Sequence, residues 1–107
     1  SKFSGIVSGK TDISLRVVGA WTLAEGGPND NPLNIGPGEQ YGTVKGAASA
    51  TAKLLRNSMY EPILESTDEP DMEQIQAIAE SPWCTNCGKR YERLLRSTYR
   101  QVKVEGS

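Results

Sequence analysis

The stretch AWTLAEGGPNDNPLNIG, residues 20–36, begins as an apolar helix and ends in a segment rich in glycine, proline and asparagine. Glu25 stands at the junction, directly before Gly26, Gly27 and Pro28. Glycine readily adopts the left-handed conformation that ends a helix, and proline cannot continue one. The stretch therefore predicts a helix that ends at a carboxylate, followed by a loop.

The helix before this junction should begin near Thr11 and Asp12, because both residue types are good N-caps. Behind them, apolar residues recur at helical spacing: Ile13, Val17, Ala20, Trp21 and Ala24. Leu15, Val18 and Leu23 broaden this face. We expect the helix to be largely buried.

The next segments combine one irregular stretch with further helix. Residues 26–42 are rich in turn-forming residues and predict a loop or a short hairpin. A second helix is predicted over residues 44–57, and one or two helical turns over residues 59–64. The apolar residues that could supply two brief strands are Leu33, Ile35, Tyr41 and Val44.

Two more helices are predicted in the last third of the chain. Asp68 is a candidate cap for the first, with Pro70 in its first turn, and the SPW at residues 81–83 should end it. The second is predicted over residues 86–103. Its inward residues are expected to be Tyr91, Leu94, Leu95, Thr98 and Val102. The fold class is mainly α, with four to five helices and at most a short β-hairpin within residues 30–44.

Size and composition indicate one small domain with a lean core, since only 36% of the 107 residues are hydrophobic. No apolar run approaches the roughly 20 residues of a membrane span, so we expect no membrane insertion. The first residues, SKFSGIVSGKTD, lack the apolar core of a secretory signal. Residues 1–107 are therefore expected to be a single domain of a larger protein, or a monomer.

The chain contains no histidine, which removes the usual Ser-His-Asp and Cys-His nucleophile systems. Cys84 and Cys87 are its only cysteines and fall short of the four ligands of a structural zinc site. We expect no metal ion and no cofactor. The cysteine pair could form a local disulfide or remain as two free thiols. Acid–base chemistry is left to carboxylates, tyrosines and lysines.

Charge is unevenly distributed although the net charge is only −1. Residues 61–80 hold seven acids and no base, whereas residues 86–107 hold six bases and two acids. A basic stripe follows steps of three and four residues: Lys89, Arg93, Arg96, Arg100 and Lys103. The stripe could be a solvated outer face or a contact with an anionic polymer. The low net charge argues against nucleic acid as the partner.

Glu25 has the setting that a glycosidase requires of its general acid. Such an acid needs a raised pKa, and burial against apolar groups or a position near a helix C-terminus raises the pKa of a carboxyl. Trp21 lies one turn before Glu25. The amides of Asn31 and Asn34 would suit sugar hydroxyls and N-acetyl groups. Alternatively, the segment is only a capped helix followed by a loop of Asx-turns.

Three segments carry a resemblance to a known family. AEGGPNDNPLNIG, followed by YGTVKGAASATAKLL, resembles the lysozyme superfamily, in particular small peptidoglycan hydrolases of phages and the glucosaminidase group. The later segment QAIAESPWCTNCGKRYERLL is similar to the closing pattern of that group. The resemblance covers about residues 12–96. It implies a lysozyme-like fold that cleaves the β-1,4 glycan strand of bacterial peptidoglycan.

The resemblance also implies roles for single residues. Glu25 falls at the catalytic acid, and Tyr91 at a mostly structural aromatic. The implied substrate-binding residues are Asn31, Asn34, Tyr41, Trp83 and Thr85. The sequence departs from the family pattern at Trp83, where tyrosine is commoner, and in the CTNC insert. The indole of Trp83 could stack on a sugar or fill the core.

Three points stay open at this stage. Glycosidases usually need two carboxyl groups, and the candidates for the second are Asp30 and Glu39. A lytic transglycosylase at the same site, or a non-catalytic wall-binding or virion structural module, would fit the same residues. The expected partner is the peptidoglycan glycan strand at the bacterial cell wall. The resemblance implies a phage protein that is released from the host cytoplasm or carried on the virion.

Overall fold

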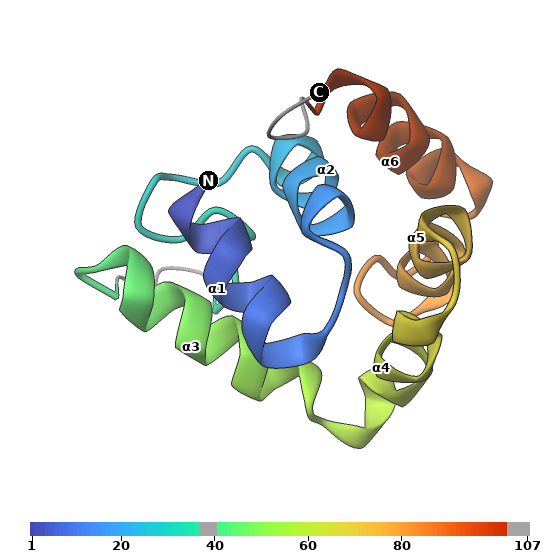
Figure 1. Ribbon diagram of the computed structural model, residues 1–107. Coiled ribbons are helices and arrows are strands. Elements are labelled where there is room, and N and C mark those ends of the chain that lie inside the picture. Colours follow the sequence, from blue (N-terminus) through green and yellow to red (C-terminus); the bar gives the residue numbers. More distant parts are fainter. Residues whose placement is uncertain (37–40, 103–107) are drawn as a thin grey trace.

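The computed structural model describes residues 1–36 and 41–102 (Figure 1). These residues form helices and loops and contain no strand, so the prediction of a mainly α fold is confirmed. Short 3-10 turns, Ser58–Tyr60 and Ser66–Asp68, flank α4. The α-helices of the described residues are α1 (Lys2–Thr11), α2 (Leu15–Glu25), α3 (Val44–Leu55), α4 (Glu61–Glu65), α5 (Asp71–Glu80) and α6 (Lys89–Gln101).

Helix α1 corrects the prediction that Thr11 and Asp12 cap the start of the helix leading to Glu25. Thr11 is the last residue of α1, and Asp12 follows in the left-handed conformation with φ 67°. The Thr11 hydroxyl donates to the carbonyl oxygen of Val7 at 2.7 Å. Short polar side chains can bond to the backbone at either end of a helix. The helix leading to Glu25 therefore begins only at Leu15.

Helix α2 packs against α1, α5 and α6, while α1 also crosses α3 and α5 packs beside α6 (Figure 1). Val17 and Trp21 of α2 are fully buried. The expectation that Leu15 and Leu23 are buried is wrong, because these side chains are 49% and 52% exposed. They lie on the opposite side of the helix from Val17 and Trp21. The neighbouring helices cover only one side of α2.

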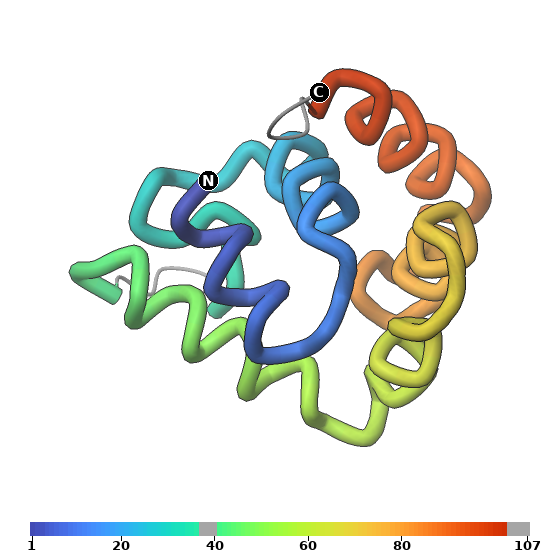
Figure 2. The backbone as a smooth tube through the Cα atoms, in the orientation of Figure 1, coloured from blue at the N-terminus to red at the C-terminus, as the bar shows by residue number. Residues whose placement is uncertain are grey.

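The loop after α2 closes on itself. Gly26 ends the helix in the left-handed conformation, as predicted, with φ 60°. The N–H of Gly27 then donates to the carbonyl of Pro32 at 3.1 Å. Figure 2 traces this loop beside the start of α1, where Gly27 and Pro32 line one hollow with Phe3. Leu33 of the same loop is buried in the core.

The last helices follow the predicted order with shifted boundaries. Asp68 belongs to the turn before α5, and Pro70 takes the N-cap position that was predicted for Asp68. The predicted stop is confirmed, because α5 ends directly before Ser81. α6 begins at Lys89, since the loop with the cysteine pair occupies the preceding residues. Leu94, expected to point inward, is 43% exposed.

None of the helices in the described ranges combines the length and the apolar character that crossing a membrane requires.

Candidate functional site

Glu25 is the last residue of α2, and a tyrosine of α6 holds its carboxylate. The side chain of Glu25 is half-buried. Its Oε2 accepts a hydrogen bond from the Tyr91 hydroxyl at 2.6 Å. A short bond from a hydroxyl to a carboxylate is among the stronger hydrogen bonds in proteins. Residues 66 positions apart in the sequence therefore meet at the end of α2.

The Tyr91 hydroxyl is itself oriented by Trp21. Tyr91 is 6% exposed, and its oxygen accepts a hydrogen bond from the indole Nε1–H of Trp21 at 3.1 Å. Because this bond occupies a lone pair, the phenol proton is directed at Glu25. Burial, and then the bond to Glu25, raise the pKa of Tyr91 far above its ordinary value of 10. The phenol therefore keeps its proton and remains a hydrogen-bond donor throughout the physiological pH range.

This chain of hydrogen bonds distinguishes the two oxygens of Glu25. Oε2 accepts the hydrogen bond from the Tyr91 hydroxyl, and Oε1 is left for another partner. The two oxygens of the carboxyl group are therefore not equivalent.

A further hydrogen bond between α2 and α6 restrains the distance between the two helices. The Thr98 hydroxyl, two turns beyond Tyr91, donates to the Ala20 carbonyl at 2.8 Å, and Thr98 is buried. Together with the bonds of Tyr91 to Trp21 and Glu25, this bond leaves little freedom for one helix to slide along the other. The Tyr91–Glu25 geometry is thus supported by the packing of both helices.

Trp83 packs in an aromatic group with Tyr60 and with Trp21, whose indole N–H bonds to Tyr91. It lies in the loop between α5 and α6 and is half-buried. Its ring centroid is 4.6 Å from that of Trp21, with the planes at 67°, and 5.8 Å from that of Tyr60. Edge-to-face contacts of this kind stabilise aromatic pairs. The indole belongs to the core on one side, and the stacking role on a sugar stays a prediction.

The two asparagines of the predicted cleft floor have different surroundings. Asn31 is 3% exposed, and its amide bonds to the Ile35 backbone through both atoms: Nδ2 donates to the carbonyl at 2.8 Å, and Oδ1 accepts from the N–H at 3.1 Å. This is the loop-forming alternative considered for that residue. Asn34 is exposed, with a left-handed φ of 55°. Of the two amides, that of Asn34 is the one open to solvent.

The other predicted site residues are spread over the surface. Tyr41 lines a hollow with Ile35 and residues of α3. Thr85 is exposed and lines a separate hollow between the end of α5 and the start of α6. Neither hollow includes Glu25 among its lining residues. Asp30 is half-buried in the loop after α2, and Glu39 lies outside the described residues.

Another hollow lies against Tyr91, the residue that bonds to Glu25, but does not include Glu25 in its lining. Its lining residues are Asn86, Cys87, Arg90, Tyr91 and Leu94. Cys84 and Cys87 form a disulfide with 5.7 Å between their Cα atoms, so the pair is a local staple. The part of the chain that the structure describes contains no group of three or more acidic or cysteine side chains placed to hold a metal ion.

The role of Tyr91 is what sequence reasoning missed. It identified the ring as an inward, structural aromatic but did not consider the hydroxyl. A signal was available, because the hydroxyl of a buried tyrosine usually finds a hydrogen-bond partner. Which partner it finds depends on how α2 and α6 pack, and no local pattern encodes that packing.

Comparison with known proteins found no match to this chain among family models, curated proteins or solved structures.

Proposed function

We propose that this chain cleaves the β-1,4 glycan strand of bacterial peptidoglycan, with Glu25 as general acid. The observation that carries the proposal is the 2.6 Å hydrogen bond from buried Tyr91 to half-buried Glu25. A glutamate that served only solubility would be expected to lie exposed, without a hydrogen bond from a buried, oriented phenol. The same arrangement serves a catalytic carboxyl, whose position must be fixed.

In the proposed reaction, the carboxyl proton of Glu25 passes to the glycosidic oxygen as the bond from that oxygen to the anomeric carbon breaks. The leaving sugar departs as an alcohol, and positive charge develops on the remaining sugar ring. Glu25 becomes a carboxylate. Because a carboxylate accepts a stronger hydrogen bond than a neutral carboxyl, the Tyr91 bond tightens as the proton leaves. Tyr91 would thus stabilise the transition state more than the ground state.

The second half of the reaction has two possible courses. In hydrolysis, Asp30 or another carboxylate directs a water molecule to the anomeric carbon. In a lytic transglycosylase, a hydroxyl of the substrate itself closes on that carbon. Mass spectrometry of the fragments separates the courses, because the hydrolysis product is heavier by one water. Glu25 has the same role in both.

A matched pair of variants tests the proposal. Glu25→Gln keeps the size of the side chain but has no acidic proton, so cleavage of purified peptidoglycan should fall by about 10²-fold or more. Glu80→Gln is the control, because Glu80 is also the last residue of a helix, α5, and is exposed. It should cleave at the parent rate. Near-normal cleavage by a folded Glu25→Gln variant would remove Glu25 from the mechanism, whereas a folded parent protein that does not cleave would favour the non-catalytic wall-binding or structural module.

A further inference from the structure

The basic stripe of α6 points directly away from the core. Within the described residues it consists of Lys89, Arg93, Arg96 and Arg100; Lys103 lies outside them. At about 100° per residue, these four positions fall within an arc of about 60°. The buried residues of α6, Tyr91, Leu95 and Thr98, lie on the opposite side of the helix. A ligand that covers the stripe would therefore lie on the solvent side of α6.

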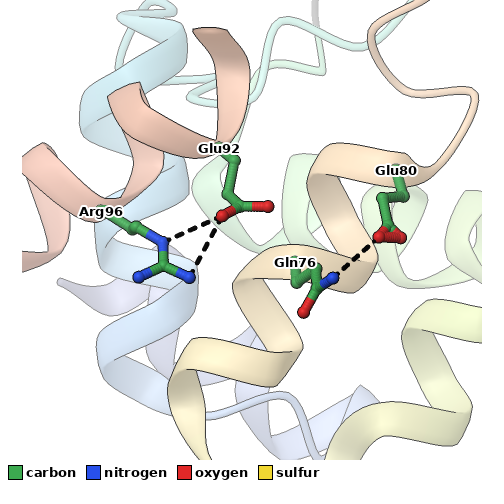
Figure 3. A network of polar contacts seen from close by, with 4 residues as sticks. All are labelled: Gln76, Glu80, Glu92 and Arg96. Atoms are coloured by element: carbon green, nitrogen blue, oxygen red, sulfur yellow. Dashed lines mark hydrogen bonds and ion pairs between the residues drawn. The ribbon is translucent and has the colours of Figure 1, made fainter. Parts of the chain in front are cut away.

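Most of the charge on the stripe is not neutralised within the described part of the chain. Lys89, Arg93 and Arg100 are exposed. Arg96 is the exception, because it lies 3.1 Å from Glu92 of the same helix (Figure 3). That contact is the single ion pair within 4 Å among the described side chains. Three cations thus project into solvent along one line.

The surroundings of the stripe restrict what could bind to it. α5 packs beside α6 and carries several acids, among them Asp71, Glu73 and Glu80. Figure 3 shows Glu80 on α5 and Glu92 on α6, and both line the hollow between the end of α5 and the start of α6. A nucleic-acid duplex is wider than one helix, so its second strand would pass over these carboxylates. A thin chain lying along α6 would avoid them.

The exposed side chains of α6 also argue against single-stranded nucleic acid. Proteins that bind single strands usually stack the bases on aromatic side chains. The exposed residues of α6 include no aromatic: they are Lys89, Arg90, Arg93, Leu94, Ser97, Arg100 and Gln101. The stripe therefore offers charge without a stacking platform. Its ligand should be a polyanion whose repeating unit has no aromatic ring.

We propose that the basic stripe binds a linear phosphodiester polymer of the bacterial cell wall, of the poly(polyol phosphate) type. The stripe presents a cation about every 4.5–6 Å over about 16 Å of helix, which suits successive phosphates of an extended chain. The choice of a wall polymer as the source rests on the proposed function. The inner side of the same helix delivers Tyr91 to Glu25, so a polymer on the outer side would retain the enzyme at the wall without blocking that site.

The test compares two double variants with the same change in net charge. Arg93→Gln with Arg100→Gln removes two exposed cations of the stripe, and Lys45→Gln with Lys53→Gln removes two exposed cations of α3. The probe is soluble poly(glycerol phosphate), titrated against each protein at several salt concentrations. The stripe variant should bind about tenfold more weakly or worse and lose part of its salt dependence. The α3 variant should bind like the parent. Equal weakening of both would mean that binding is unspecific, and would overturn the proposal.

Further measurements decide the source of the polyanion and keep the two proposals apart. A single-stranded oligonucleotide and vesicles of anionic phospholipid replace the polymer in parallel titrations. Tighter binding of either one would overturn the assignment to the wall. Cleavage is measured on peptidoglycan freed of phosphate polymers, and polymer binding on the Glu25→Gln variant. Intact cleavage by the parent protein without polymer binding refutes only the stripe proposal, whereas polymer binding together with no cleavage by the parent protein refutes only the catalytic one.

Discussion

At the scale of single residues, Trp21, Tyr91 and Glu25 form a continuous chain of two hydrogen bonds. The indole N–H donates to the phenol oxygen, and the phenol O–H donates to the carboxylate. Within the described residues, no buried side-chain nitrogen or oxygen lacks a hydrogen-bond partner. A satisfied buried network is rigid, because every alternative rotamer would leave a polar atom unpaired.

Tyr91→Phe should therefore separate the positioning of Glu25 by the hydroxyl from the packing of the ring. The ring remains, but the Trp21 N–H loses its acceptor, so we expect a loss of about 1–3 kcal/mol in the free energy of unfolding. Glu25 loses its anchor, and kcat on peptidoglycan should fall by about 10- to 100-fold with little change in KM. Urea unfolding and steady-state kinetics measure the two effects.

The control for this prediction is Tyr99→Phe. Tyr99 is on the same helix and donates to Asp71 over the same 2.6 Å, but it is less buried and away from Glu25. This variant should cleave at the parent rate. A Tyr91→Phe protein that matches it in kcat would show that Glu25 does not depend on the phenol.

Trp83→Ala tests whether the indole has a role beyond the core. Truncating a fully buried tryptophan costs about 3–5 kcal/mol, and we expect less here because Trp83 is half-buried. If its open side stacks on sugar, affinity for glycan fragments should fall as well. Thermal melting with and without fragments measures both. A lower melting temperature with unchanged fragment affinity would show that Trp83 contributes only to packing of the core.

At the scale of elements, the loop after α2 depends on two adjacent glycines for different reasons. Gly26 has a left-handed φ of 60°, and a Cβ added there would meet open space. Gly27 has an ordinary φ, but a Cβ there would overlap the Asn31 carbonyl oxygen and lie 2.6 Å from that of Pro32. The first position requires backbone freedom, and the second requires the absence of a side chain.

The two alanine variants should differ accordingly. Gly26→Ala should cost about 1–2 kcal/mol, which is the penalty of the left-handed conformation. Gly27→Ala should cost more, because backbone atoms must move and the bond to Pro32 is lost. It should also reduce cleavage, since this loop continues directly from Glu25. Denaturant unfolding of both proteins checks the order, and equal costs would contradict the tight closure of the loop.

At the scale of the whole molecule, the raised pKa of Tyr91 predicts a loss of stability in alkali. The folded protein holds the phenol proton above pH 10, where an unfolded tyrosine releases it. Above that pH the unfolded state is increasingly favoured. The free energy of unfolding should fall by about 1.4 kcal/mol per pH unit for this one proton, until the folded phenol also ionises. Urea unfolding at stepwise pH measures the slope.

Tyr91→Phe should flatten this slope, whereas Tyr99→Phe should affect it less. Tyr99 also has a raised pKa, through burial and its bond to Asp71, but it is the less buried of the two. If the free energy of unfolding of Tyr91→Phe falls with pH as steeply as that of the parent protein, other groups cause the loss of stability in alkali.

The sequence by itself determined the features that depend on neighbouring residues. The helix stop at Gly26, the helix from Val44 and the break before Pro82 all follow from glycine, proline and apolar spacing within a few residues. The position of Glu25 at a helix end was predictable for that reason. The exception is α1, where Thr11 and Asp12 close a helix although their residue types equally suit the start of one.

Only the tertiary structure decided which side of each helix is covered and what Glu25 meets. Leu15, Leu23 and Leu94 are apolar and correctly spaced, yet no neighbouring helix covers them. Tyr91 reaches Glu25 because α6 packs on α2 across 66 positions of sequence. Local patterns fix where a helix begins and ends through its own hydrogen bonds. Its partners follow from the joint burial of several helices in one lean core, which no single segment encodes.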